Sequence, residues 1–400
     1  MYNSERILET SIEQNQTNGC RNDVNSDGTD PYKDPTVSIP CGPSRRIVLH
    51  IDLNNTILVS DAVTRQGTVA AIEYFLSTVT WGRMTKGKWE WLSEAPSLLQ
   101  PCEGAITYYS QFGRVACFTT VGPGRRFRKV LEEHLELLRW PSDLPADKEL
   151  SVKGEDGKLY HWILPSFFQM LQDLTSQGVE FSVLFRTFGS DLPRVLNAVK
   201  RAVEQGSHPL FPDLPALKLR VNVTAGRIKC SSKGATLIRG EEHVSTRDGE
   251  RHVYQYLSSA EGLGGFQDHF DWWARNTYSI LGGKPLWIDP FDPKVQHIFI
   301  DDNIRQNDED TIVHPKVLDV CFLFSRLTVP YVLPTPLNAH MFLQVFLDPE
   351  GLQTRTASTS ELYDLCLVQN DLLKAISEPG YFTRRVQICM ENYEGNIQKG

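Results

Sequence analysis

The sequence predicts an α/β protein with a doubly wound, Rossmann-like parallel sheet and an inserted cap domain. Two observations favour this fold class. Short runs rich in Ile, Val, Leu and Phe alternate with segments whose apolar residues recur at helical spacing. Three of the runs, residues 47–51, 179–185 and 297–300, have the length and apolar character of strands buried on both faces. We therefore expect these three strands in one parallel sheet.

The composition is that of a soluble globular protein. The 400 residues carry a net charge of −8 and the sequence pI is about 5.7, which gives no electrostatic basis for binding nucleic acid or an anionic membrane surface. We find no transmembrane candidate, and the first residues lack the apolar stretch of a secretory signal. The eight cysteines are scattered singly, which favours free thiols and a cytoplasmic location.

The pattern divides the chain into distinct parts. Residues 1–44 are rich in Asn, Ser, Asp, Gly and Thr and predict a disordered leader. The remaining parts are a core domain (45–60 and 160–330), a cap insertion (61–159), a small β insertion (224–260) and a C-terminal helical extension (331–400). Within them we expect helices at 68–80, 128–138, 165–178, 192–203, 266–280, 339–346 and 360–376, and further strands at 217–223 and 320–324.

Each of the three buried strands is followed by a polar group. Asp52 follows the first strand, Thr187 the second, and the pair Asp301 and Asp302 the third. Because the carboxyl ends of parallel strands lie on one edge of a sheet, these residues can meet there. Mg²⁺ prefers carboxylate oxygens, a lysine offsets phosphate charge, and an aspartate can form an aspartyl-phosphate. The residues therefore indicate a site for Mg²⁺ and a phosphoryl group.

The order of these residues resembles the haloacid dehalogenase (HAD) superfamily of phosphatases and phosphotransferases. Its members carry Asp-x-Asp-x-Thr after the first strand, Ser or Thr after the second, then a Lys, and an acidic pair after a later strand. The resemblance covers residues 45–325 and depends on few positions. The matching residues here are Asp52-Leu53-Asn54-Asn55-Thr56, Thr187, Lys284 and Asp301-Asp302.

The resemblance implies a role for each matching residue. Asp52 would be the nucleophile and a ligand of Mg²⁺. Asp301 and Asp302 would complete the metal site, and Asn54 would supply its backbone carbonyl to the metal. Thr187 would bind the phosphoryl oxygens.

The lysine of the pattern has two candidates. Lys284 lies in a Gly-Gly-Lys-Pro turn that can present its amine at a strand edge, where it would stabilise the phosphorylated carboxylate. Lys294 lies in a proline-flanked polar loop much nearer to the acidic pair. A lysine in such a loop is typical of a solvated surface charge, so we prefer Lys284.

Asn54 departs from the family pattern at a catalytic position. In the family's phosphatases the second aspartate of the first motif is the general acid and base. A carboxamide can neither protonate the leaving alcohol nor activate water. Such catalysis is typically worth roughly a hundred- to ten-thousand-fold, so Asn54 predicts slow or stalled turnover unless another group substitutes.

The segment between the first two strands is longer than one crossover helix requires. By the resemblance it would be a cap over the site, and a large cap favours a small phosphorylated metabolite over a protein as the substrate. The tryptophans Trp81, Trp89 and Trp91 either line the substrate pocket or form the core of the cap.

Three hypotheses follow for function. The first is a Mg²⁺-dependent phosphohydrolase or phosphotransferase that acts on a small phosphorylated metabolite through an aspartyl-phosphate at Asp52. The second is a HAD-like binding or regulatory protein that keeps metal or phosphate binding but is impaired in turnover by Asn54. The third is an unrelated doubly wound domain whose motifs match by chance.

Overall fold

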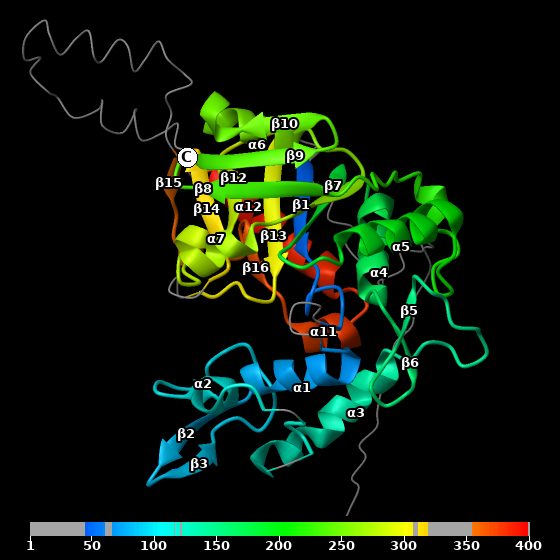
Figure 1. Cartoon of the computed structure of the whole chain (residues 1–400), viewed down its shortest axis with the longest axis vertical. Coiled ribbons are helices and arrows are strands. Elements are labelled where there is room, and N and C mark those ends of the chain that lie inside the picture. The colour runs from blue at the N-terminus through cyan, green and yellow to red at the C-terminus, as the bar shows by residue number, and fades with distance from the viewer. Residues whose placement is uncertain are drawn as a thin grey trace, which may run out of the picture. The chain divides into compact units, whose positions relative to one another are not determined.

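The computed structural model describes residues 45–60, 66–115, 117–120, 122–306, 311–318 and 354–398, which all belong to one unit, Pro43–Gly400. This unit contains a large, mostly parallel sheet, whose strands lie in the upper half of Figure 1. Among these strands only the pairings of β9 with β10 and with β8 are antiparallel. In order across the sheet, the strands are β10 (Glu242–Ser245), β9 (Gly234–Arg239), β8 (Gly226–Ser231), β11 (Leu263–Gln267), β7 (Phe181–Thr187), β1 (Arg46–Asp52), β13 (Val295–Asp301) and β16 (Leu367–Gln369).

The three strands expected from the sequence lie side by side in the middle of this sheet. β1 pairs in parallel with β7 on one side and with β13 on the other. Residues 47–52 of β1 are all buried, because both faces of the strand are covered. The prediction of a mixed α/β fold with a large parallel sheet is therefore confirmed.

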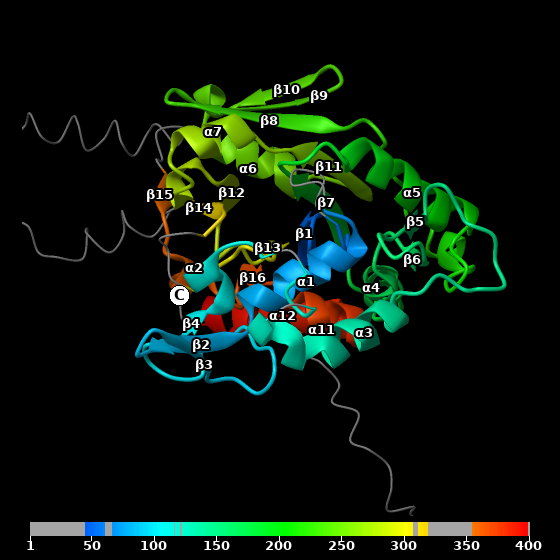
Figure 2. The same cartoon turned by 60° about the horizontal axis from the view of Figure 1, so that its bottom comes forward.

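Helices pack on both faces of the sheet. Ile47, Leu49 and Ile51 of β1 join a core with α4 (Pro165–Ser176), α5 (Leu192–Gln205) and α12 (Tyr381–Ile397). Val48, which points to the other face, packs with α6 (Glu250–Ser258). Figure 2 shows α12 and α6 on opposite sides of β1 and β13. The predicted helices at 165–178 and 192–203 are confirmed with small shifts at their ends.

A second, three-stranded sheet contains the predicted catalytic lysine. It consists of β12 (Lys284–Ile288), β14 (Val313–Leu318) and β15 (Thr354–Thr356). Lys284 is the first residue of β12 and is buried, so it begins a strand and does not lie in the Gly-Gly-Lys-Pro turn that we expected. Its backbone N–H donates to the carbonyl of Ile312, which fixes the start of the strand.

Residues 66–161 form a group of small elements between β1 and α4 in the chain. The predicted helices at 68–80 and 128–138 are confirmed as α1 and α3. Rings of Trp89, Trp91 and Tyr108 contact one another, so two of the three tryptophans belong to an aromatic cluster. The elements are α1 (Thr68–Thr78), β2 (Trp81–Thr85), β3 (Lys88–Trp91), β4 (Ile106–Thr107), α2 (Tyr108–Phe112), η1 (Gly122–Phe127), α3 (Arg128–Leu137), β5 (Ser151–Lys153) and β6 (Leu159–His161).

Several sequence predictions were wrong in the region that follows α5. Residues 217–223 form no strand: η2 (Leu214–Leu217) ends at the first of them, and only Val221 makes an isolated bridge. The small β insertion is continuous with the large sheet through β8, and its last part is α6 together with η3 (Thr246–Asp248). The expected helix at 266–280 is replaced by the end of β11, α7 (Phe270–Arg275) and η4 (Ile280–Gly282).

The C-terminal part is not purely helical. The expected helix at 360–376 is divided into α10 (Thr359–Leu362) and α11 (Leu372–Ser377), because β16 lies between them and pairs with β13. The predicted leader (1–44), the strand at 320–324 and the helix at 339–346 lie outside the described residues.

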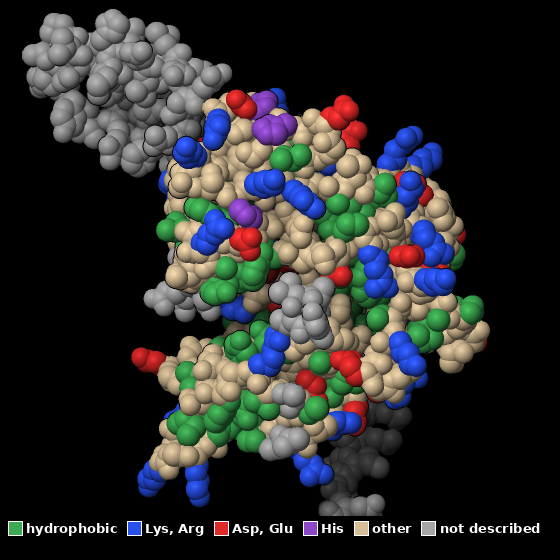
Figure 3. Space-filling model, in the orientation of Figure 1, with side chains coloured by type: hydrophobic (Ala, Val, Ile, Leu, Met, Phe, Trp, Pro, Cys, Tyr) green, Lys and Arg blue, Asp and Glu red, His purple; other side chains and the backbone are tan. Residues whose placement is uncertain are grey.

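Among the residues that are described, no helix combines the length and the apolar character needed to cross a membrane. On the face drawn in Figure 3, basic and acidic side chains are intermixed.

Candidate functional site

The carboxyl ends of three adjacent strands lie at one edge of the large sheet. β1 ends at Asp52, β7 at Thr187 and β13 at Asp301. The register places Asp52 opposite Arg186, the residue before Thr187, and pairs Ile51 with the residue before Asp301. Parallel pairing therefore gathers these side chains as the sequence predicted.

Three carboxylates form a compact cluster at this edge. Oxygen atoms of Asp52, Asp301 and Asp302 all lie within 4.8 Å of one another. The three residues are 5%, 0% and 7% exposed, so water screens their charges poorly. The cost of burying charge raises the pKa of Asp52 to about 7, and burial together with the neighbouring Asp301 raises the pKa of Asp302 well above its usual range.

The Lys284 ammonium is inserted into the carboxylate cluster. Its Nζ donates to Oδ1 of Asp52 at 2.5 Å and to Oδ2 of Asp301 at 2.8 Å. Two carboxylates on one ammonium raise the pKa of this lysine against the opposing effect of burial. Lys294, the other candidate for this role, is exposed. When all three carboxylates are ionised, the one ammonium leaves the cluster with two negative charges.

The loop after β1 holds Asp52 in place. The hydroxyl of Thr56 donates to Oδ2 of Asp52 at 3.2 Å and accepts the backbone N–H of Asp302 at 3.3 Å. Asn55 has a left-handed φ of 57°, which asparagine tolerates better than most residues. The side-chain amide of Asn370 donates to the carbonyl of Asn55 at 3.1 Å. These contacts tie the loop to β13 and to the segment after β16.

A second polar group lies at the end of β7. The hydroxyl of Thr187 donates to Oδ1 of Asn54 at 3.4 Å and accepts the N–H of Gly189 at 2.9 Å. The side-chain amide of Asn54 donates to Oδ2 of Asp191 and to the carbonyl of Ser60, both at 3.2 Å. Thr187 and Asn54 are thus brought into contact, as two residues of one site require.

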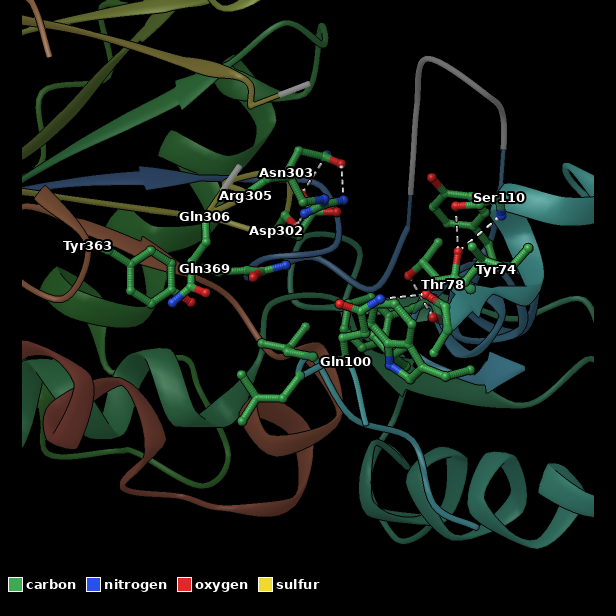
Figure 4. Close-up of a pocket in the computed structure, with 18 residues that line it drawn as sticks. Tyr74, Thr78, Gln100, Ser110, Asp302, Asn303, Arg305, Gln306, Tyr363 and Gln369 are labelled. Atoms are coloured by element: carbon green, nitrogen blue, oxygen red, sulfur yellow. Dashed lines mark hydrogen bonds between the residues drawn. The ribbon is translucent and has the colours of Figure 1, made fainter. Parts of the chain in front are cut away.

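A cavity of about 520 Å³ opens next to the acidic cluster. Asp302 lines it together with Arg305 on one side, and Tyr74 and Ser110 lie on the opposite side (Figure 4). Trp81 also lines this cavity, unlike Trp89 and Trp91. The cavity wall also includes the half-buried amide of Gln369.

The cluster suits a hard divalent cation. It offers carboxylate oxygens, which Mg²⁺ prefers together with water and phosphate oxygens. One divalent ion neutralises the two negative charges that Lys284 leaves, whereas without an ion the cluster can become neutral only by taking up protons. The donor set fits Mg²⁺ and other hard divalent cations equally.

Some residues at this edge were not singled out by the sequence. Asp191 and Gln369 carry no motif, and their positions depend on how α5 begins and on the pairing of β16 with β13. Gln369 is the register partner of Asp301, so a strand that the sequence did not predict places it here. In the sequence, Asp191 is distinguished only by its position before the expected helix at 192–203. An aspartate at that position is equally typical of an ordinary helix N-cap.

Comparisons with protein-family models, with curated proteins and with solved structures find no match to this chain.

Proposed function

We propose that this chain is a HAD-type, Mg²⁺-dependent phosphohydrolase or phosphotransferase that acts on a small phosphorylated metabolite through an aspartyl-phosphate at Asp52. The observation that carries this proposal is the buried cluster in which the Lys284 ammonium bridges Asp52 and Asp301 at the carboxyl edge of a parallel sheet. This is the position where such sheets place their ligands. The proposal includes a doubly wound, Rossmann-like core, a cap formed by the insertion 61–159, and a cytoplasmic location.

In the proposed reaction, Asp52 attacks phosphorus and the ester bond to the leaving oxygen breaks. The phosphoryl group then passes from Asp52 to water or to an acceptor hydroxyl. Thr187 would donate its hydroxyl to a phosphoryl oxygen, and Lys284 would keep Asp52 deprotonated and oriented for attack. Mg²⁺, held by Asp52, Asp301, Asp302 and the carbonyl of Asn54, would offset the charge of the phosphate.

The cavity beside Asp302 supports a small substrate. Its volume of about 520 Å³ falls in the range of small-ligand pockets. It is lined from both the 66–161 segment and the core, so the segment acts as a cap in this proposal. The Arg305 guanidinium and the amides of Gln306 and Gln369 would bind the part of the substrate that does not react.

A second candidate is a binding or regulatory protein with impaired turnover. The observation that favours it is Asn54, since the carboxamide cannot transfer protons and its two polar atoms are already hydrogen-bonded to Thr187 and Asp191. Such a protein would keep the metal and phosphate contacts of the cluster but would hydrolyse no ester.

One experiment separates the two candidates. The purified chain is assayed with Mg²⁺ against a panel of phosphate esters, beside Asp52→Asn and the control Asp143→Asn, which changes an exposed aspartate. Phosphate release by the wild type and by Asp143→Asn, lost in Asp52→Asn, supports the enzyme. Mg²⁺-dependent phosphate binding without any release supports the binding protein.

A further inference from the structure

Asp191 does not make the hydrogen bond expected at its position. It is the N-cap of α5, where an aspartate normally accepts a backbone N–H from the first turn of the helix, but its side chain makes no such bond. Its Oδ2 instead accepts the side-chain amide of Asn54 at 3.2 Å. The other oxygen, Oδ1, has no hydrogen-bond partner among the described residues. The carboxylate therefore faces Asn54 and does not cap the helix.

The backbone leaves a space where Asp191, Asn54 and Thr187 converge. A Cβ atom added to Gly189 would lie 3.1 Å from Oδ1 of Asn54, 3.3 Å from the hydroxyl of Thr187 and 3.8 Å from Oδ2 of Asp191. Three polar groups thus surround the vacant side-chain position of one glycine. A substrate or water oxygen near this position would lie within reach of all three groups.

We propose that Asp191 is the general acid and base of the proposed reaction and supplies the carboxylate that the first motif lacks at Asn54. The inference rests on the proposed function and on two geometric facts. The carboxylate of Asp191 is one hydrogen bond away from the Asn54 side chain, and it is released from capping its own helix. The three carboxylates of the described cluster, in contrast, are engaged by Lys284 or belong to the metal set.

The reaction has two steps, in which Asp191 first donates a proton and then accepts one. In the first, an Asp52 oxygen forms a bond to phosphorus while the ester P–O bond breaks, and the proton of the Asp191 carboxyl passes to the leaving oxygen to give the alcohol. In the second, the Asp191 carboxylate takes one proton from water, and the water oxygen bonds to phosphorus. The P–O bond to Asp52 then breaks, so phosphate leaves and both aspartates return to their starting states.

The test compares two substrates with different leaving groups. An alkyl phosphate has a poor leaving group that needs protonation, whereas p-nitrophenyl phosphate does not. We expect Asp191→Asn to lower formation of the aspartyl-phosphate from the alkyl phosphate by about 10²–10⁴-fold and to lower its formation from p-nitrophenyl phosphate much less. Because the base is also lost, the phosphorylated enzyme should accumulate and be visible by mass spectrometry. Asn keeps an oxygen that can accept the Asn54 amide, so the variant should fold.

Two further variants complete the experiment. The swap Asn54→Asp with Asp191→Asn moves the carboxylate across the same hydrogen bond and should recover alkyl phosphate hydrolysis by at least tenfold over Asp191→Asn. The control is Asp213→Asn. Asp213 is the N-cap residue of η2, near the C-terminal end of α5, and its side chain likewise makes no capping hydrogen bond. This variant should retain wild-type rates.

The outcomes distinguish this inference from the proposed function. An unchanged rate in Asp191→Asn, or an equal loss of aspartyl-phosphate formation with both substrates, overturns the inference alone, since the first shows no role and the second shows only positioning. A wild type without any hydrolysis dependent on Asp52 overturns the proposed function and this inference with it.

Discussion

The Nζ atom of Lys284 lies 2.5 Å from Oδ1 of Asp52, although 232 positions separate the two residues in the chain. They come from different sheets, since Asp52 ends β1 of the large sheet and Lys284 begins β12 of the smaller one. The lysine also binds Asp301, so one ammonium links both sheets to the carboxylate cluster. Both the stability of this edge and the proposed chemistry depend on this contact.

Replacing Lys284 tests the contact directly. We expect Lys284→Met to lower the free energy of unfolding by about 3–5 kcal/mol, because two buried carboxylates, Asp52 and Asp301, lose their only ammonium partner among the described residues. The measurement is chemical denaturation at pH 7.5. Lys294→Met, at an exposed lysine, should change the value by less than about 0.5 kcal/mol. Equal effects of the two variants would contradict the prediction.

Metal binding should be visible as stabilisation. A ligand that binds only the folded state, and is present at about 100 times its dissociation constant, raises the free energy of unfolding by about 2.7 kcal/mol. Mg²⁺ should therefore raise the melting temperature above that measured in EDTA. Asp302→Asn removes one of the three clustered carboxylates and should abolish most of this increase. Asp143→Asn serves as the control at an exposed position. The cluster is not the metal site if Asp302→Asn retains the full increase.

Asn54→Asp should not by itself produce a better enzyme. The new carboxylate would lie about 3.2 Å from Oδ2 of Asp191, and two like charges at that distance cannot both ionise freely. We expect a loss of roughly 1–3 kcal/mol of stability at pH 7.5, measured by denaturation, and recovery of the loss when Asp191→Asn is added. Additive effects of the two substitutions would show that the side chains do not interact.

Gln369 is expected to bind substrate without taking part in the chemistry. Its side chain lines the cavity, and its backbone is the register partner of Asp301. With an ester that the wild type hydrolyses, Gln369→Leu should raise KM several-fold and leave kcat nearly unchanged. The substitution removes a contact that stabilises the bound substrate and the transition state equally. A selective fall in kcat would instead place this amide at the reacting group.

Two buried histidines should make the fold sensitive to acid. Burial lowers the pKa of His161 to about 4 and that of His208 to about 3, and their rings stack at 5.3 Å between centroids. As the pH falls below about 6.5 the unfolded chain binds protons that the folded chain excludes. Stability is therefore complete above pH 6.5 and decreases towards pH 4, by roughly 2 kcal/mol per histidine at pH 5.

The pH effect has a direct control. Nδ1 of His208 accepts the N–H of Leu210 at 3.3 Å, and no charged group contacts the ring in the described structure, where it packs against Phe168, Phe211 and His161. His208→Phe should reduce the difference in unfolding free energy between pH 7.5 and pH 5. His243→Phe, at an exposed histidine, should leave that difference unchanged. The opposite ranking would contradict the assignment.

Local pattern was sufficient for the centre of the fold. The apolar runs that became β1, β7 and β13, and the periodic segments that became α1, α3, α4 and α5, lie within about two residues of their predicted bounds. A strand buried on both faces gives a continuous apolar run, and a helix buried along one stripe gives apolar residues at helical spacing. The polar residues that end these strands, Asp52, Thr187 and Asp301, were found for the same reason, because a strand end is a local feature.

The elements that the sequence missed depend on distant partners. β11 contains two glycines, and Gly265 is required because a Cβ there would lie 2.7 Å from Leu192 and 2.8 Å from the Phe185 carbonyl oxygen. β16 is three residues long and exists because β13 offers it an edge. Neither constraint is visible in a local window, so these segments were assigned to helices or left without structure.

The sequence by itself determined that Asp52, Thr187 and Asp301 stand at strand ends and that an asparagine, Asn54, lies two residues after Asp52. Only the tertiary structure decided that Lys284 is buried between Asp52 and Asp301, and that Asp191 faces Asn54 instead of capping α5. The physical reason is that strand ends are set by neighbours in the chain, whereas the partner of a buried charge is set by packing between segments far apart. The contacts on which the proposed reaction at Asp52 depends therefore became visible only in the folded chain.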